Sequence, residues 1–140
     1  MEDVRTPQLG RVDARPMSPH LGVWRWHITM AGSILHRATG VALYGAALVA
    51  AWWAVALAMG PGAYGVFLAV AGSGIGRLAM FGIALSFFYH LANGVRHLVW
   101  DSGRGFALKW ANQSGVAAMA FGVVMTLVTF AIAWRIGALA

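Results

Sequence analysis

Three long apolar stretches, separated by short segments, follow one another along the chain near residues 31–59, 78–100 and 115–138. Each is at or above the ~20 residues that an α-helix needs to cross about 30 Å of hydrocarbon. The stretches are continuously apolar instead of alternating, which favours helices over the strands of a membrane barrel. The pattern therefore predicts an all-α membrane protein with three transmembrane helices in the region 31–140.

The segments outside the apolar stretches predict an arm and a hairpin. Residues 1–30 contain acidic residues and prolines but no early apolar core, so we expect an arm that stays in the mature protein and no cleaved secretion signal. The first connection, GPGAYGVFLAVAGSGIG, is broken by Pro61 and several glycines, which lack the spacing of a phosphate-binding loop. Its apolar middle either lies along the membrane interface or lengthens the second span.

Composition agrees with this pattern, since 60% of the 140 residues are hydrophobic and 10% are charged, against about 25% charged in an ordinary soluble domain. The basic residues expected on one side of the membrane are Arg5, Arg11, Arg15, Arg25, Arg37, Arg96, Arg104 and Lys109. Those expected on the other side are Arg77 and Arg135. The positive-inside rule then predicts a cytoplasmic N-terminus and a periplasmic C-terminus. The net charge of +6 is thus a topology signal, and we expect no nucleic-acid partner.

Polar residues occupy the start of the first apolar stretch, in the segment SILHRATG. Residues at i, i+3, i+4 and i+7 share one helix face, and here they are Ser33, His36, Arg37 and Gly40. A charged group inside a transmembrane helix costs about 3 kcal/mol unless it meets water, a partner or a ligand. Arg37 alone could extend to the cytoplasmic headgroups, but this explains neither Ser33 nor His36. The face is therefore a candidate site, with donors suited to the carbonyl headgroup of a membrane-soluble substrate.

A second polar cluster ends the second stretch, in HLANGVRHLVWDSG. His90, Gly94 and His97 share a helix face, and the glycine leaves space for a bulky planar group. His90 would lie near the middle of the membrane, where a neutral imidazole is best explained as a metal ligand, with haem iron the usual metal in such bundles. The alternative is a packed histidine that is hydrogen-bonded to another helix.

A haem at His90 would need a second ligand. His90 and His97 lie ~10.5 Å apart along the helix axis, whereas two axial nitrogens are only ~4 Å apart. We expect His36 to lie too close to the cytoplasmic end to face His90 across a porphyrin, and to be better placed for a haem propionate or an interfacial ligand. The second ligand is therefore expected from another protein.

Two segments, RPMSPHLGVWRWHITMAGSILHRATG (15–40) and HLANGVRHLVWDSG (90–103), resemble the two signatures of the cytochrome b membrane anchor of succinate dehydrogenase, respiratory complex II. The resemblance implies a heteromeric helical bundle in the bacterial inner membrane, built with a second three-helix anchor subunit. It also implies a flavoprotein that holds FAD and an iron–sulfur protein, both in the cytoplasm. The absence of cysteine agrees, because this chain cannot hold a cluster through thiolates.

The resemblance also implies roles for particular residues. Ser33 and Arg37 would contribute to a ubiquinone site, and His90 would be an axial ligand of haem b. His36 and Arg37 would lie next to the haem propionates, with His97 in the vicinity of the haem. The chain would then be a subunit, not catalytic alone, of succinate:ubiquinone oxidoreductase in the tricarboxylic acid cycle and aerobic electron transport.

Two other functions are compatible with parts of the pattern. The first is a purely structural membrane anchor or small transport subunit without a cofactor, although a transporter would more often show inverted repeats or broken helices. The second is a self-contained dihaem cytochrome, which would need two well-spaced histidine pairs within its spans. An absorption spectrum separates the first of these from a haem protein.

Overall fold

The computed structural model describes residues 25–137, and in that range it contains four helices: α1 (Ile28–Ala58), α2 (Pro61–Gly72), α3 (Gly74–Asp101) and α4 (Leu108–Arg135). Helices α1, α3 and α4 are long and apolar enough to cross a membrane, which confirms the three predicted spans. The chain is therefore a multi-pass membrane protein. Most of the predicted arm, residues 1–24, lies outside the described residues, and residues 28–30 belong to α1.

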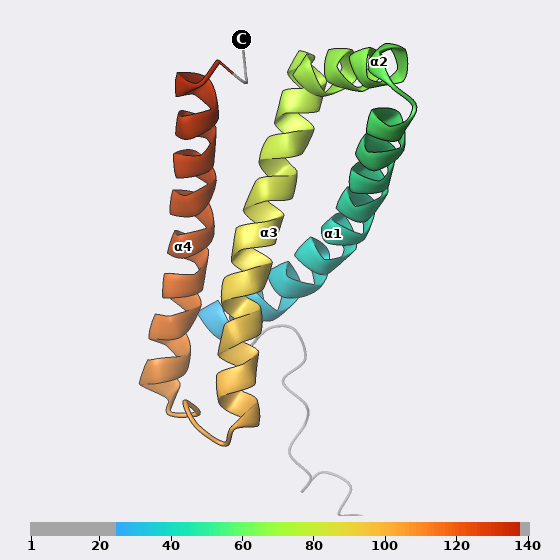
Figure 1. The fold of residues 1–140 in the computed structure, drawn as a ribbon. Coiled ribbons are helices and arrows are strands. Elements are labelled where there is room, and N and C mark those ends of the chain that lie inside the picture. Colours follow the sequence, from blue (N-terminus) through green and yellow to red (C-terminus); the bar gives the residue numbers. More distant parts are fainter. Residues whose placement is uncertain (1–24, 138–140) are drawn as a thin grey trace, which may run out of the picture.

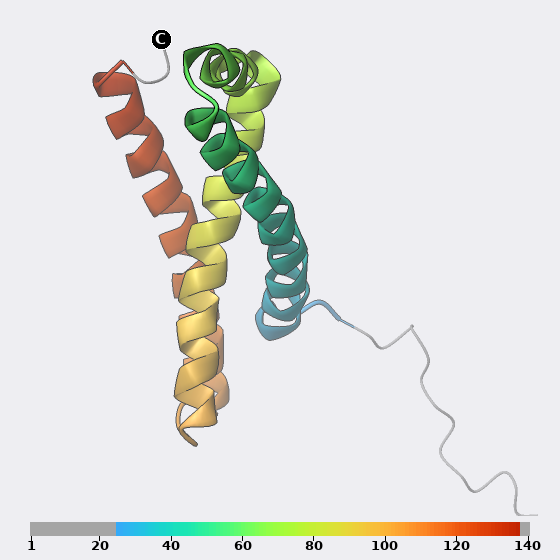
Figure 2. The same ribbon diagram turned by 45° about the vertical axis from the view of Figure 1, so that its right-hand side comes forward.

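The three long helices form an uneven bundle (Figure 1). Helix α3 packs against both α1 and α4. We call the end that contains the start of α1 and the loop between α3 and α4 the lower end. In Figure 1, helix α1 starts behind the lower part of α3 and diverges from α4 toward the other, upper end; Figure 2 shows the same oblique arrangement of α1 and α3 from another side.

The connection between α1 and α3 is a separate helix, so it does not lengthen the second span. Gly60 has a φ of +96°, a conformation that favours glycine, and Pro61 is the first residue of α2. Helix α2 then lies across the upper ends of α1 and α3 (Figure 1). It is held there by Phe67, which is buried with its ring edge-on to Trp52 at a centroid distance of 4.9 Å.

Helices α3 and α4 begin earlier than the apolar stretches predicted. Helix α3 starts at Gly74, because the Ser73 hydroxyl accepts a hydrogen bond from the Gly76 backbone at 3.1 Å and caps the helix. Helix α4 starts at Leu108 and continues through Asn112 and Gln113. Polar residues at a membrane surface end an apolar run but not a helix. Hydropathy alone therefore predicts the first residues of α3 and α4 too far along the chain.

Small residues allow α4 to approach α3 closely. The buried positions of α4 are Ala111, Gly115, Ala118, Gly122 and Thr126, a spacing of three or four residues that forms one stripe. The contact is tightest at Gly122, where an added Cβ would lie 2.9 Å from Cβ of Tyr89 and 3.1 Å from its Cα. At Gly122 the backbone of α4 therefore lies directly against α3 at Tyr89.

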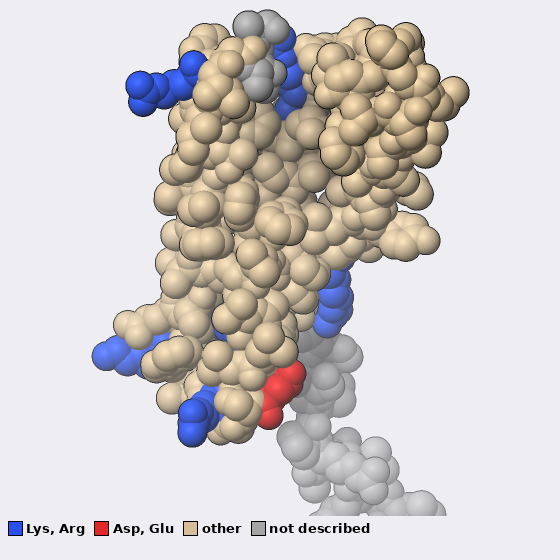
Figure 3. All heavy atoms as spheres, in the orientation of Figure 1, with Lys and Arg blue, Asp and Glu red and all other residues tan. Residues whose placement is uncertain are grey.

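Charged side chains lie toward the two ends of the bundle on the face shown in Figure 3, and the belt between them carries none. The lower end of the described chain includes Asp101, Arg104 and Lys109, all exposed. The upper end includes Arg77 and Arg135. This distribution agrees with a bundle whose middle faces lipid or another apolar surface.

Candidate functional site

Three histidines from two helices meet where α1 crosses α3. The rings of His36 and His90 are stacked, with a centroid distance of 3.9 Å and an interplanar angle of 12°. The ring of His97 lies 5.0 Å from that of His36, tilted by 43°. All three side chains are half-buried. Within the described residues, no group of three or more His, Cys, Asp or Glu side chains is arranged to hold a metal ion by itself.

His36 lies level with His90 instead of closer to the end of the bundle, because their rings are in contact. Positions along two helices give the relative depths of their residues in the membrane only if the helices are parallel. Helix α1 instead runs obliquely to α3 (Figure 1), so that its third turn, which carries His36, lies against the part of α3 that carries His90. His36 covers one face of the His90 ring.

The surroundings of His90 leave space on one side and closely confine the ring on the other. A Cβ added to Gly40 would lie 3.3 Å from Cε1 of His90, so the ring rests against the α1 backbone. The Nδ1 atom of His90 lies 3.1 Å from the Thr39 hydroxyl. A Cβ added to Gly94, one turn along α3, would meet nothing within 4 Å. The surface of α3 is therefore open at Gly94, and the expected planar group beside it stays a prediction.

Ser33 and Arg37 form a pair on α1 next to this cluster. Arg37 Nη2 donates a hydrogen bond to Ser33 Oγ at 3.2 Å, which confirms that the two residues share a helix face. The Arg37 side chain is exposed and Ser33 is half-exposed. The pair offers a guanidinium and a hydroxyl at a position that other molecules can reach.

The histidine cluster offers polar groups that fit one side of a haem site. Nδ1 of His36 is buried and has no hydrogen-bond partner in the described chain, so the cluster contains a polar atom that a further group could satisfy. The open space at Gly94 can accept the edge of a planar group. Arg37 adds a cation one residue from His36, as a carboxylate-bearing cofactor would need.

The side chain of Arg96 does not lie at the membrane surface, where a topology signal would place it. Its side chain is 6% exposed and points into the contact between α3 and α4. It donates hydrogen bonds to Ser114 Oγ at 2.9 Å, to the Ala111 carbonyl at 2.8 Å and to Asn93 Oδ1 at 2.9 Å. The guanidinium carbon also lies 4.1 Å from the centre of the Trp100 ring. The charge is therefore used inside the bundle, where it joins two helices.

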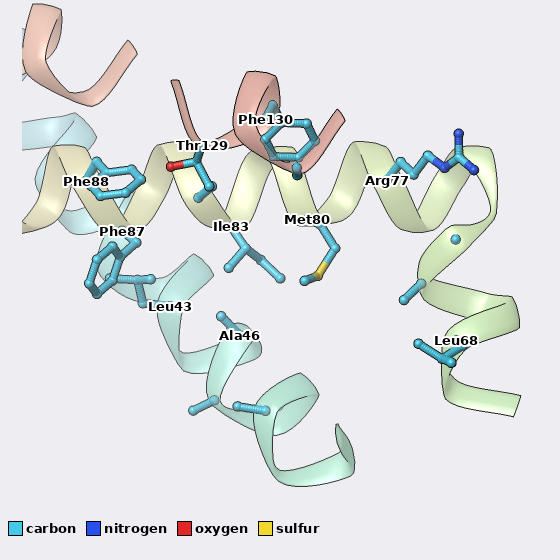
Figure 4. Close-up of a pocket in the computed structure, with 16 residues that line it drawn as sticks. Leu43, Ala46, Leu68, Arg77, Met80, Ile83, Phe87, Phe88, Thr129 and Phe130 are labelled. Atoms are coloured by element: carbon cyan, nitrogen blue, oxygen red, sulfur yellow. The ribbon is translucent and has the colours of Figure 1, made fainter. Parts of the chain in front are cut away.

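A second feature of the bundle is an apolar pocket of about 830 Å³ between α1, α3 and α4 below α2. In Figure 4, Met80 and Ile83 point from α3 toward α1, and Arg77 lies at the end next to α2. None of the residues predicted for the haem or the quinone lines this pocket. The structure thus separates it from the histidine cluster.

Sequence reasoning missed three residues that fix this arrangement. Thr39 contacts His90 and lies three residues after His36, on the same helix face. The Tyr89 hydroxyl donates to the Gly32 carbonyl at 2.8 Å and joins α3 to α1. Arg96 joins α3 to α4, and its place on one stripe with Tyr89 and Asn93 was a signal that these polar residues face a neighbouring helix.

Comparisons with known proteins identify the family. The family model of the succinate dehydrogenase/fumarate reductase transmembrane subunit matches residues 11–129. The chain is 37% identical over 113 residues to the succinate dehydrogenase cytochrome b556 subunit of Rickettsia felis, covering 81% of this chain and 88% of that protein. It is also 37% identical to the cytochrome b556 subunit of Paracoccus denitrificans, with 82% and 88% covered. The mitochondrial cytochrome b560 subunit of Sus scrofa is 38% identical, with 81% and 68% covered.

These matches extend across both polar segments and all but the last turns of α4. They agree with the three apolar spans and with the imidazole cluster between α1 and α3. The chain therefore belongs to the family of succinate dehydrogenase and fumarate reductase transmembrane subunits, as a cytochrome b subunit of succinate dehydrogenase that is not catalytic alone.

Proposed function

We propose that this subunit holds haem b through His90 and contributes Ser33 and Arg37 to the ubiquinone reduction site of a bacterial succinate:ubiquinone oxidoreductase. The observation that carries the proposal is the stacked imidazole pair at the α1–α3 crossing, with the Ser33–Arg37 pair beside it on α1. The relatives are cytochrome b556 and cytochrome b560 subunits, and these names support a haem in this chain.

The position of His90 supports its role as an axial ligand. Its ring is half-buried in the middle of α3 and held from one face by His36. His36 and Arg37 carry N–H groups suited to the haem propionates, and His97 lies close enough to His36 to share that surface. When bound, haem b supplies a one-electron carrier whose potential depends on its axial ligands and their hydrogen bonds.

The second axial ligand is expected from the second three-helix anchor subunit. His36 covers the face of the His90 ring, whereas a metal binds in the ring plane, along the lone pair of a nitrogen. His97 is ~10.5 Å further along the same helix axis. Large apolar side chains of α1 are exposed in the single chain, among them Val41 at 76% and Tyr44 at 78%. A partner helix, together with lipid, would cover them.

The Ser33–Arg37 pair has the donors that a quinone headgroup needs. A quinone carbonyl accepts hydrogen bonds, and both the hydroxyl and the guanidinium can donate them. Negative charge that develops on the carbonyl oxygen during reduction would be stabilised by Arg37. The exposure of Arg37 leaves room for the iron–sulfur subunit to approach the same site.

The remaining cofactors belong to partner subunits in this proposal. The chain has no cysteine, so the iron–sulfur clusters belong to one cytoplasmic subunit, and FAD belongs to a flavoprotein subunit. The excess of basic residues at one end of the spans supports insertion into the inner membrane with the N-terminus in the cytoplasm and the C-terminus in the periplasm.

The proposal is tested with His90→Ala in the purified complex. We expect this variant to lose or shift the low-spin b-type absorption band, because the iron would lack its ligand from this chain. His27→Ala is the matched control, since His27 is an exposed histidine before α1 whose ring nitrogen lies 3.3 Å from the nearby Arg25 carbonyl. An unchanged spectrum in assembled His90→Ala complex would remove His90 as a ligand, and a wild-type complex without any haem band would favour a purely structural anchor.

A further inference from the structure

We propose that Thr39 holds the His90 imidazole in the tautomer with hydrogen on Nδ1, so that Nε2 is the free ligand nitrogen. Thr39 would thus be a positioning residue, which rests on the proposed role of His90 as a haem ligand. Thr39 is on α1 and His90 on α3, so the contact also connects the two helices that form the histidine cluster.

The hydrogen bonds around Thr39 determine the direction of this contact. The Thr39 hydroxyl lies 2.8 Å from the Leu35 carbonyl and 3.0 Å from the His36 carbonyl. A hydroxyl has one hydrogen to donate, whereas a carbonyl can only accept. The hydrogen therefore points back along α1, a common arrangement for threonine in transmembrane helices. The oxygen lone pair is left to face His90 Nδ1 at 3.1 Å.

An oxygen that accepts from Nδ1 requires the hydrogen to be on that nitrogen. A neutral imidazole carries one N–H, so Nε2 then has the lone pair that can bind a metal. Within the described chain, the His90 side chain makes its hydrogen bond through Nδ1, with the Thr39 hydroxyl. The tautomer follows from a neighbouring hydroxyl and does not require a carboxylate.

Two further contacts restrict rotation of the ring. His36 is stacked on one face at 3.9 Å, and the Gly40 position has no side chain, so the ring lies directly against α1. Both contacts are to the ring face or to Cε1 and Nδ1, which leaves the direction of Nε2 to the rest of the site. Thr39 thus fixes both the proton and the orientation of the ligand.

Such an outer hydrogen bond influences a metal site in a measurable way. Removal of the partner of a ligating histidine typically weakens metal binding by about 10- to 100-fold. Loss of the acceptor on Nδ1 also makes the imidazole a weaker electron donor, which disfavours the oxidised iron. We therefore expect a higher midpoint potential and weaker haem retention when the hydroxyl is absent.

The test compares Thr39→Val with Thr39→Ser in the purified four-subunit complex. The readouts are haem content per complex and the haem midpoint potential from a redox titration. Thr39→Val should raise the potential and release haem more readily, by about 10- to 100-fold in affinity. Thr39→Ser keeps the hydroxyl and should behave as wild type. The control is Thr129→Val, which removes an equivalent hydrogen bond, from the Thr129 hydroxyl to the Met125 carbonyl at 2.8 Å, at an exposed position of α4.

The outcomes separate this inference from the proposed function. If His90→Ala loses the haem band and Thr39→Val keeps the wild-type potential and haem content, the positioning role is refuted and the ligand role stands. If Thr39→Ser shifts the potential as far as Thr39→Val, or Thr129→Val does the same, the hydroxyl on Nδ1 is not the cause. If His90→Ala keeps the haem band, both ideas are refuted together.

Discussion

Replacement of Arg96 by leucine should destabilise the packing of α3 against α4. In the wild-type chain the guanidinium donates three hydrogen bonds inside the bundle, to Asn93, Ser114 and the Ala111 carbonyl. Leucine keeps an apolar side chain at the position but removes every donor. The Asn93 side chain is 1% exposed, and its Nδ2 has no hydrogen-bond partner among residues 25–137. The substitution therefore leaves both the nitrogen and the oxygen of a buried amide unpaired within that range.

The size of the effect follows from these contacts. A buried acceptor that loses its partner costs about 1–3 kcal/mol, and hydrogen bonds from charged groups contribute about 1.5–3 kcal/mol each. The desolvation of the wild-type guanidinium, several kcal/mol, offsets part of the loss. Ser114 keeps a partner, because its hydroxyl lies 3.3 Å from the Ala111 carbonyl. The net destabilisation expected is about 2–4 kcal/mol.

The measurement is thermal unfolding of this subunit inside the detergent-solubilised complex, followed by the fraction of the chain that survives a short protease pulse. At about 2–4 °C per kcal/mol for a chain of this size, Arg96→Leu should lower the midpoint by roughly 5–15 °C. The control is Arg104→Leu, an exposed arginine in the loop before α4, which should leave the midpoint unchanged.

A double variant tests the cause of this loss. Much of the loss in stability arises at the unpaired Asn93 amide. The double variant Arg96→Leu with Asn93→Leu should therefore be more stable than the sum of the two single effects predicts. A midpoint for Arg96→Leu equal to that of wild type would refute the reasoning. Strict additivity in the double variant would show that the cost does not arise at Asn93.

Two further predictions concern the quinone pair and the helix contact. Arg37→Ala should reduce ubiquinone reduction by about 100-fold and Ser33→Ala by less, while succinate oxidation with an artificial acceptor survives; equal loss of both activities would instead indicate failed assembly. Gly122→Ala should destabilise the subunit by about 1–3 kcal/mol, because the new Cβ would overlap Tyr89 at 2.9 Å. Gly82→Ala adds a Cβ that meets nothing within 4 Å, so it should be neutral, and equal melting of the two variants would contradict the close approach.

The location of the candidate site could be predicted without coordinates because helical periodicity is local. Residues three and four apart share a face whatever surrounds the helix, and the Arg37–Ser33 hydrogen bond has this spacing. The same rule grouped His90 with Gly94 and His97 on α3. The roles of these residues toward haem and quinone stay predictions until the variants are measured.

The contacts between helices could not be predicted in this way. The depth of His36 was misjudged because depth along one helix carries no information about the angle at which another crosses it. Arg96 was counted as a membrane-surface charge, since a sequence does not say which stripe of a helix faces a neighbour. Thr39 was overlooked because its partner is 51 residues away in the chain.

The sequence by itself determined the three spans, the helix breaks and the polar face on each helix, because hydropathy and the 3.6-residue period act over a few neighbouring residues. Only the tertiary structure decided which of these faces meet. Small residues brought α4 against the stripe of α3 that carries Arg96, and the oblique crossing of α1 brought His36 and Thr39 to His90. These contacts depend on how the surfaces of two whole helices fit together, and the sequence of one segment does not specify that fit.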